Sequence, residues 1–112
     1  MKLSHEEYVL QQRRKVAKLA SDVLKGDLSI LKAAIEIVKI RFELDVDEND
    51  KDLIAFVAIE SEIDHLPIGP ERKYWNEDAL KEKDKEINES EKWANEFGLE
   101  ACQRLIDRFG AY

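Results

Sequence analysis

Three side chains that could do chemistry together lie near the middle of the chain. Glu60 and Asp64 are four residues apart, so on a helix they share one face, and His65 follows directly. Two carboxylates and an imidazole could bind a divalent cation or move protons by general acid–base catalysis. The same residues also fit an acidic helix end at which His65 caps the last carbonyls or pairs with Asp64, and we favour this structural interpretation.

The familiar catalytic motifs are absent from the 112 residues. The sequence contains no glycine-rich phosphate-binding loop, no dinucleotide fingerprint, no HExxH pair and no GxSxG turn. Its two histidines, His5 and His65, are sixty residues apart, which argues against a histidine-rich metal site. We therefore expect a protein that is not an enzyme and that holds no cofactor or metal. A small metal-dependent hydrolase built on Glu60, Asp64 and His65 is the alternative.

Two further carboxylates, Asp84 and Glu91, fall in the apolar stripe of the last predicted helix, on either side of Ile87. A carboxylate that loses water at such a position needs a cationic partner. We expect structural ion pairs rather than a ligand site. The cations that could supply them are Arg72, Lys73, Arg13 and Arg14.

The charge is distributed unevenly along the chain. The net charge is −7, but residues 1–41 carry nine basic and five acidic side chains, whereas residues 42–112 carry nine basic and twenty acidic ones. A chain this acidic is a poor nucleic-acid binder, because duplex binding depends on neutralising phosphates. The basic row Arg13, Arg14, Lys15 and Lys18 is interpreted as a solvated helix face, with RNA binding as its alternative. We expect a basic protein as partner and no direct nucleic-acid contact.

The acidic residues are densest over residues 43–64, where Lys51 is the only base. Runs of this kind are solvated loops or interaction surfaces. Carboxylates on the exposed side of the last helix extend the expected surface, and Tyr74 and Trp75 are its apolar anchors, whereas Trp93 is expected in the core. The candidate partner-binding residues are Asp45, Asp47, Glu48, Asp50, Asp52, Glu60, Glu62, Asp64, His65, Tyr74, Trp75, Glu82, Glu86 and Glu89.

Helical patterns account for most of the first half of the chain. A helix is predicted from Ser4, whose hydroxyl can form a capping box with Glu7, to a stop at Gly26. An almost wholly apolar helix over residues 27–42 belongs in the centre of the fold. An acidic loop over residues 46–52 supplies Asp50 as N-cap for a helix over residues 53–63. The β-branched residues of this last segment also suit a strand, but no second strand could pair with it.

The second half is predicted as an irregular connection followed by one long helix. Pro67 and Pro70 prevent a continuous helix over residues 65–75. From Asn76 a seven-residue spacing of apolar side chains continues to Phe109, so that Gly98 kinks the helix rather than ending it; a break over residues 97–99 is the alternative. We expect an all-α fold with one domain over residues 1–112. It is a bundle of four to five antiparallel helices around the apolar second one, with a long C-terminal helix.

The chain has few features that bear on its location. The single cysteine, Cys102, excludes an intramolecular disulfide and suits a reducing cytoplasm. The N-terminus lacks the apolar stretch of a secretion signal, and no segment is apolar enough to span a bilayer. We expect a cytoplasmic protein that makes no membrane contact. Its oligomeric state is left open.

Two segments stand out from the general helical pattern: ESEIDHLPIGPERKYW at residues 60–75, which includes D-H-L-P-x-G at residues 64–69, and EACQRLIDRF at residues 100–109. With the glycine-ended first helix and the apolar second helix, residues 10–109 resemble a family of small helical bacterial proteins that are similar to immunity proteins. Immunity proteins are antidotes encoded beside the toxins of contact-dependent growth inhibition and related polymorphic toxin systems. The resemblance implies a protein without catalytic residues that neutralises a cognate toxin. For a nuclease toxin, the acidic face would cover the basic active-site cleft or a surface beside it.

Overall fold

Four α-helices make up most of the chain, and the computed structural model describes them within residues 4–110. They are α1 (His5–Leu24), α2 (Ile30–Ile40), α3 (Lys51–Ile63) and α4 (Glu77–Phe109). Two short 3-10 helices, η1 (Arg41–Glu43) and η2 (Pro70–Tyr74), lie in the connections, and residues 4–110 contain no strand. The predicted all-α class and the long C-terminal helix are confirmed. The segment that could have been a strand is the helix α3.

Each α-helix starts at a polar side chain that accepts a hydrogen bond from the first turn. Ser4 Oγ accepts from the backbone N–H of Glu7 at 3.1 Å, and Asp50 Oδ1 accepts from two N–H groups at the start of α3, as predicted. Asn76 Oδ1 does the same for α4. The predicted start of the second helix at residue 27 is wrong, because Ser29 is its cap and accepts from the N–H of Leu31. The chain turns at Gly26, before Ser29, and the φ of +81° at this position suits glycine.

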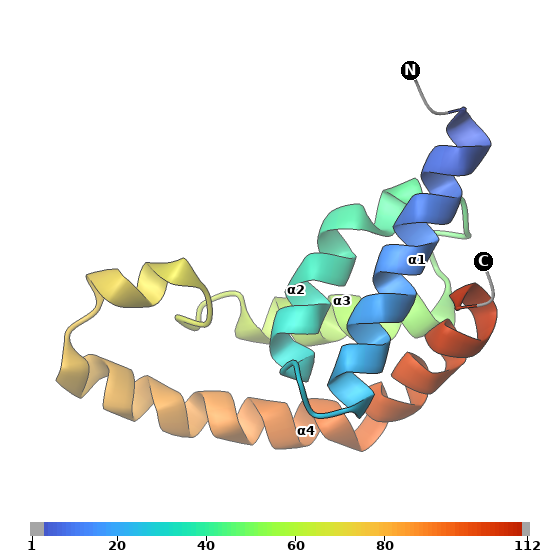
Figure 1. The fold of residues 1–112 in the computed structure, drawn as a ribbon. Coiled ribbons are helices and arrows are strands. Elements are labelled where there is room, and N and C mark those ends of the chain that lie inside the picture. Colours follow the sequence, from blue (N-terminus) through green and yellow to red (C-terminus); the bar gives the residue numbers. More distant parts are fainter. Residues whose placement is uncertain (1–3, 111–112) are drawn as a thin grey trace.

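The apolar helix α2 lies at the centre of the fold. Its Ile30, Leu31, Ala34 and Ile37 are buried, and it packs against each of the other three α-helices. Figure 1 shows α1 and α2 as one antiparallel pair and α3 and α4 as another, with the two pairs crossing. The prediction that the helices gather around α2 is confirmed. Because α3 and α4 are antiparallel, the start of α3 lies beside the last turns of α4.

Gly98 lies where α4 crosses the core. A Cβ at this position would clash with Ile30 Cδ1 and would meet Ile59 Cδ1 at 3.4 Å, so glycine lets α4 approach α2 and α3 closely. The helix continues through Gly98 without interruption, and Figure 1 shows its last turns running at an angle to the rest. The prediction of one helix to Phe109 is confirmed, and the alternative break over residues 97–99 is wrong.

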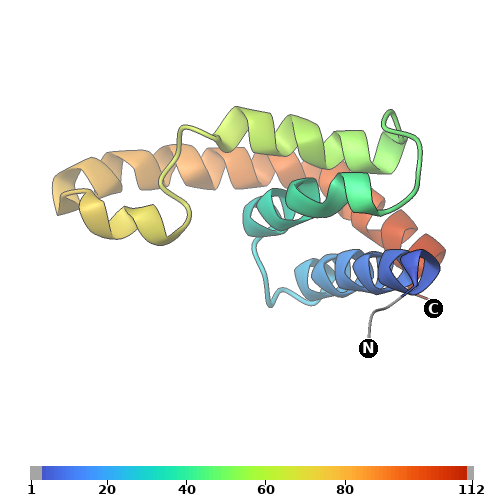
Figure 2. The same ribbon diagram turned by 90° about the horizontal axis from the view of Figure 1, so that it is seen from above.

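The start of α4 extends beyond the rest of the bundle and carries η2 along its side (Figure 2). Arg72 joins the two, because it contacts Asp84 at 3.0 Å and donates to the backbone oxygen of Pro67 at 2.9 Å. We call this part of the molecule, residues 66–84, the arm. Of the four cations that the sequence offered as partners, Arg72 is the one that pairs with Asp84. The ion pair expected for Glu91 is not found: this residue lies half-buried beside the turn between α1 and α2 and forms no ion pair within residues 4–110.

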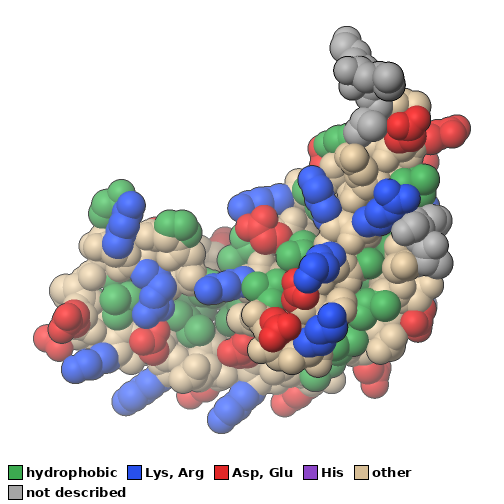
Figure 3. All heavy atoms as spheres, viewed as in Figure 1, with side chains coloured by type: hydrophobic (Ala, Val, Ile, Leu, Met, Phe, Trp, Pro, Cys, Tyr) green, Lys and Arg blue, Asp and Glu red, His purple; other side chains and the backbone are tan. Residues whose placement is uncertain are grey.

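The side of the molecule seen in Figure 3 carries many of the basic side chains of α1 and α2. Arg14, Lys15 and Lys18 are exposed on α1, and Lys32 and Lys39 are exposed on α2. Of the helices within residues 4–110, none is both long enough and apolar enough to cross a membrane. The excess of acidic residues belongs mainly to α3, α4 and the loop before α3.

Candidate functional site

The acidic run over residues 43–64 does not form one continuous surface. The loop that holds Asp45, Asp47 and Glu48 precedes α3, whereas Glu60, Glu62, Asp64 and His65 belong to its last turn or follow it. The 13 residues of α3 separate the two groups by about 20 Å at 1.5 Å per residue. The predicted partner-binding surface therefore divides into two parts with different surroundings.

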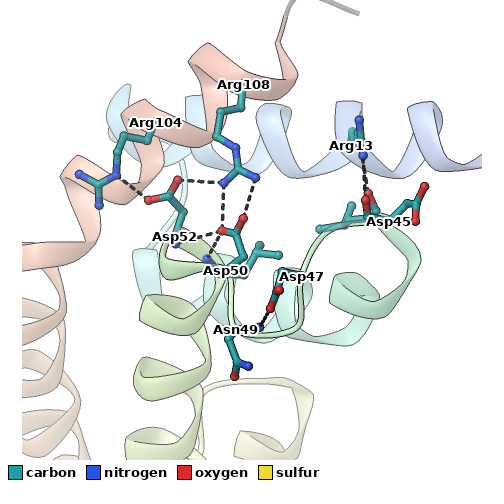
Figure 4. Close-up of polar contacts among 10 residues, drawn as sticks. Arg13, Asp45, Asp47, Asn49, Asp50, Asp52, Arg104 and Arg108 are labelled. Atoms are coloured by element: carbon teal, nitrogen blue, oxygen red, sulfur yellow. Dashed lines mark hydrogen bonds and ion pairs between the residues drawn. The ribbon is translucent and has the colours of Figure 1, made fainter.

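At the start of α3, two of the predicted binding residues instead form ion pairs within the chain. Figure 4 shows Arg108 reaching from α4 to both Asp50 and Asp52, and Arg104 reaching to Asp52. Arg108 Nη2 contacts Asp50 Oδ2 at 2.7 Å, and Arg108 Nη1 contacts Asp52 Oδ2 at 2.9 Å. Asp52 is only 7% exposed. The assignment of Asp50 and Asp52 to a partner surface is not supported, because their charges are neutralised within the chain.

These contacts also change the pKa of Asp50 and of both arginines. Hydrogen bonding from Arg108, reinforced by the N–H groups of the first turn, lowers the pKa of Asp50. The same carboxylates raise the pKa of both arginines: the hydrogen bond from Asp52 is the main cause for Arg104, and that from Asp50 for Arg108. We call Asp50, Asp52, Arg104 and Arg108 the arginine clamp. It joins the last turns of α4 to the N-cap of α3.

The rest of the loop before α3 is held through its backbone, so that its carboxylates stay exposed. Arg13 donates to the backbone oxygens of Leu44 and Asp45, the latter at 3.1 Å. Asp45 has a φ of +53°, a left-handed conformation that aspartate tolerates better than most residues. Asp47 accepts from the N–H of Asn49 at 2.7 Å and remains exposed, as does Glu48.

At the other end of α3, carboxylates from two helices surround an aromatic side chain. Glu62 of α3 and Glu86, Glu89, Ser90 and Trp93 of α4 line a shallow groove of about 340 Å³, which we call the acidic groove. Trp93 is 37% exposed and meets Phe97 edge to face, with the ring centres 5.0 Å apart. The prediction that Trp93 belongs to the core is wrong: the neighbouring Ala94 is buried, whereas Trp93 lies on the side of α4 that faces the groove, and there its indole is only partly covered.

His65, which follows α3, contacts one of the carboxylates that line the groove. Its Nε2 lies 2.9 Å from Glu86 Oε1, and Lys83 Nζ lies 3.5 Å from Glu86 Oε2. The hydrogen bond with His65, together with the charge of Lys83, lowers the pKa of Glu86. Glu62 and Glu89 are exposed and form no ion pair within residues 4–110. The groove therefore presents two free carboxylates and one that is already engaged.

The remaining predicted residues lie on or near the arm. Tyr74 is 80% exposed, with Lys73 Nζ 5.1 Å from the ring centre, and Trp75 is exposed at the end of η2. Glu82 is exposed on α4. Positions 82, 86, 89 and 93 follow the i, i+4, i+7, i+11 spacing of one helix face, so Glu82 continues the row of the acidic groove. The same spacing could have identified Trp93 as a member of that row from the sequence.

The structure does not bring Glu60, Asp64 and His65 together as a metal site. Glu60 is half-buried, and His65 Nδ1 is 3.9 Å from Asp64 Oδ1 but pairs more closely with Glu86. Within residues 4–110 no group of three or more His, Cys, Asp or Glu side chains is placed to hold a metal ion. Burial raises the pKa of Cys102 to about 11, so its thiol is protonated at neutral pH. No observation favours the hydrolase alternative.

The two segments that carry the resemblance to immunity proteins lie at separate places in the structure. Residues 60–75 supply Glu62 and His65 and lead into the arm, whereas residues 100–109 supply the arginines of the clamp. Comparison of the chain with protein-family models, with curated proteins and with solved structures finds no match.

Proposed function

We propose that this protein is an immunity protein that binds a basic toxin domain through the acidic groove and thereby neutralises it. The observation that carries the proposal is the exposed Trp93 set among Glu62, Glu86 and Glu89, which come from two helices. Tryptophan, with tyrosine and arginine, is enriched among the residues that contribute most to binding at protein interfaces. Carboxylates around it favour a partner whose surface is positively charged.

The electrostatics of the groove suit fast and specific association. Glu62 and Glu89 have no cation of their own within the described chain, so they can pair with lysine or arginine side chains of the partner. Glu82 extends the negative row along α4, and the local field attracts a basic surface over a distance set by the ionic strength. A nuclease binds a polyanion and so has a basic cleft, which an acidic protein can block.

The proposal assigns binding to the acidic groove and not to the whole acidic run. Asp50 and Asp52 are occupied by the arginine clamp, and Asp45, Asp47 and Glu48 lie at the opposite end of α3. Tyr74 and Trp75 are also exposed, but they lie on the arm and do not line the acidic groove. The exposed carboxylates at the two ends of α3 provide a direct comparison for the test.

The test uses the toxin-like product of the neighbouring gene as the binding partner. Calorimetry with the purified pair measures Kd for the native chain, for Trp93→Ala and for Glu89→Lys. We expect Trp93→Ala to weaken binding by about 30-fold or more, and Glu89→Lys by about tenfold. Raising the salt concentration from about 50 mM to about 300 mM should weaken the native complex, mainly through slower association.

Glu48→Lys is the matched control, because it makes the same charge change at an exposed position on the other end of α3. It should alter Kd by less than about threefold. The proposal is wrong if the neighbouring gene product does not bind. It is also wrong if Glu48→Lys weakens binding as much as Glu89→Lys, because negative charge anywhere on the protein would then be sufficient.

A further inference from the structure

The arginine clamp and the acidic groove are built from the same kinds of side chain. In the clamp, Arg108 Nη2 contacts Asp50 Oδ2 at 2.7 Å and Arg108 Nη1 contacts Asp52 Oδ2 at 2.9 Å, as Figure 4 shows. The guanidinium carbon of Arg108 also lies 4.9 Å from the centre of the Phe109 ring. An arginine side chain is thus held here by two carboxylates and an aromatic ring.

The acidic groove offers two carboxylates and an aromatic ring without a cation. Glu62 of α3 and Glu89 of α4 form no ion pair within residues 4–110, and Trp93 lies one turn after Glu89 on the same face of α4. Lys85 and Lys92 are neighbours of Glu89 on α4, but neither lines the groove or pairs with a carboxylate within residues 4–110. Both carboxylates are therefore available to a cation from another molecule.

The balance of charge around the groove stays negative when its own cations are counted. Glu86, the third carboxylate of the lining, is contacted by His65 at 2.9 Å and by Lys83 at 3.5 Å. Three carboxylates thus face at most two cations, even when His65 is protonated. The surplus of negative charge belongs to Glu62 and Glu89, which come from different helices.

The size of the groove and the properties of its ring select the cation. A volume of about 340 Å³ is at the lower end of the range for small-ligand pockets, so the groove holds a side chain rather than a helix. Phe97 meets Trp93 edge to face and leaves it 37% exposed. A guanidinium is planar, so it can stack on an indole while its N–H groups donate to carboxylates beside it. The ammonium of lysine is a compact and strongly hydrated charge, which gains less from such contacts.

We propose that the acidic groove receives an arginine side chain of the partner, with its guanidinium against Trp93 and its N–H groups donating to Glu62 and Glu89. This inference rests on the proposed function and narrows it from a basic surface to one side chain. The arginine is the central contact of the complex, because the indole and both free carboxylates act on the same group. Lysines of the partner act mainly through the surrounding field.

The preference for arginine can be tested without the toxin. The probes are the Nα-acetyl amides of arginine, of lysine and of citrulline, which has the shape of arginine without its charge. NMR titration of the complete, isotopically labelled chain follows the indole N–H signals of Trp93 and Trp75, assigned with Trp93→Phe. Trp75 is the internal control, because it is also 37% exposed but does not line the groove.

We expect the arginine amide to shift the signal of Trp93 with a Kd in the millimolar range and to leave that of Trp75 almost unchanged. The lysine amide should bind about threefold more weakly, and the citrulline amide should give no saturable shift. Equal binding of the lysine and arginine amides would overturn the proposal. A shift of Trp75 as large as that of Trp93 would do the same, because any exposed indole would then be sufficient.

Charge variants locate the contact. Glu62→Gln combined with Glu89→Gln should weaken binding of the arginine amide by about fivefold or more, because it removes both free carboxylates. Asp47→Asn combined with Glu48→Gln is the matched control, since it removes two charges at exposed positions before α3. This control should change Kd by less than about twofold, and thermal melting checks that both variants fold. Equal weakening in the two variants would contradict the assignment to the groove.

The complex with the neighbouring gene product separates this inference from the proposed function. Phenylglyoxal modifies arginine side chains, and mass spectrometry should find at least one toxin arginine that reacts in the free toxin and is protected by the native chain. If the toxin binds and none of its arginines is protected, the arginine inference is wrong and the proposed function stands. If the toxin does not bind but the arginine amide binds as expected, the proposed function is wrong and the groove takes an arginine of another protein.

Discussion

The two ends of α3 are equally rich in carboxylates but use them differently. At its start, Asp50 and Asp52 pair with Arg108 and Arg104 and fasten two helices together. At its end, Glu62 faces Glu86 and Glu89 across the acidic groove. Because α3 and α4 are antiparallel, the start of α3 meets the last turns of α4 and its end meets the middle of α4. The role of each acidic group is therefore decided by what the neighbouring helix presents to it.

The largest effect should come from breaking the arginine clamp. Arg108→Ala removes the arginine that pairs with both Asp50 and Asp52. Asp52 is only 7% exposed, and Arg104 is then the only arginine of the clamp that remains. We expect the free energy of unfolding to fall by about 2 to 3 kcal/mol, since removing one member of a poorly solvated ion pair strands the other. Urea denaturation followed by circular dichroism measures the change. A loss no greater than that caused by Glu86→Gln at the other end of α3 would contradict the comparison.

The thiol of Cys102 gives a second measure of the same difference. Cys102 is buried and its pKa is raised to about 11, so in the folded chain it should react very slowly with a thiol reagent at pH 8. If labelling requires unfolding, Arg108→Ala should raise the rate roughly 30-fold to 150-fold, in proportion to the loss of stability. Glu86→Gln should leave the rate close to that of the native chain. A fast reaction in the native chain would mean that α4 opens locally beside Cys102.

Acid should affect the start of α3 more than its end. The pKa of Asp50 is lowered in the folded chain, so the ionised carboxylate stabilises the fold. This stabilisation is complete above the ordinary aspartate pKa of about 4 and is lost as the pH falls through the lowered pKa of the folded chain. Glu86 also has a lowered pKa, but it lies in solvent, where its pairing with His65 contributes little. Denaturation between pH 7 and pH 2 should show a decline that is reduced in Asp50→Asn. An unchanged decline would assign acid sensitivity to other carboxylates.

The smallest effects on stability should come from the acidic groove. Glu89→Lys removes no ion pair within residues 4–110, and Glu86→Gln removes only contacts exposed to solvent. Each should change the free energy of unfolding by no more than about 0.5 kcal/mol. The same urea denaturation measures both variants. A loss above about 1.5 kcal/mol for either would show that the groove supports the fold, and its assignment as a free binding surface would fail.

The helices themselves were predictable because their signals are local. Ser4, Gly26 and Asp50 act within one turn of their own positions, and the apolar spacing after Asn76 shows a single helix through Gly98. The length and composition of the apolar segments were enough to place α2 in the centre. The largest error was at the start of α2, because Ser29 caps it within a segment that is apolar on both sides; the predicted end of α2 at residue 42 and the start of α3 at residue 53 each differ from the structure by two residues.

The candidate site was predictable only in part, because its arrangement depends on contacts between distant segments. Arg108 and Asp50 are 58 positions apart, and no spacing rule connects them. The apolar character of tryptophan suggested a core position for Trp93, yet burial depends on whether a neighbouring helix covers that side of α4. Glu82 and Glu89 are exposed on α4 as expected, whereas Glu86 is half-buried and engaged by His65. Which of them meet α3 follows from the antiparallel packing of α3 against α4.

The packing of α1 has a consequence for how the chain is made on the ribosome. Among the helices, α1 and α4 share the most extensive contact, although they stand at opposite ends of the described chain. Synthesis proceeds at about 5 to 20 residues per second, so α1 must wait for several seconds until α4 has left the exit tunnel. During that time α2 has only part of its apolar surface covered. Part of the apolar surface of α1 and α2 therefore stays exposed until α4 has been made.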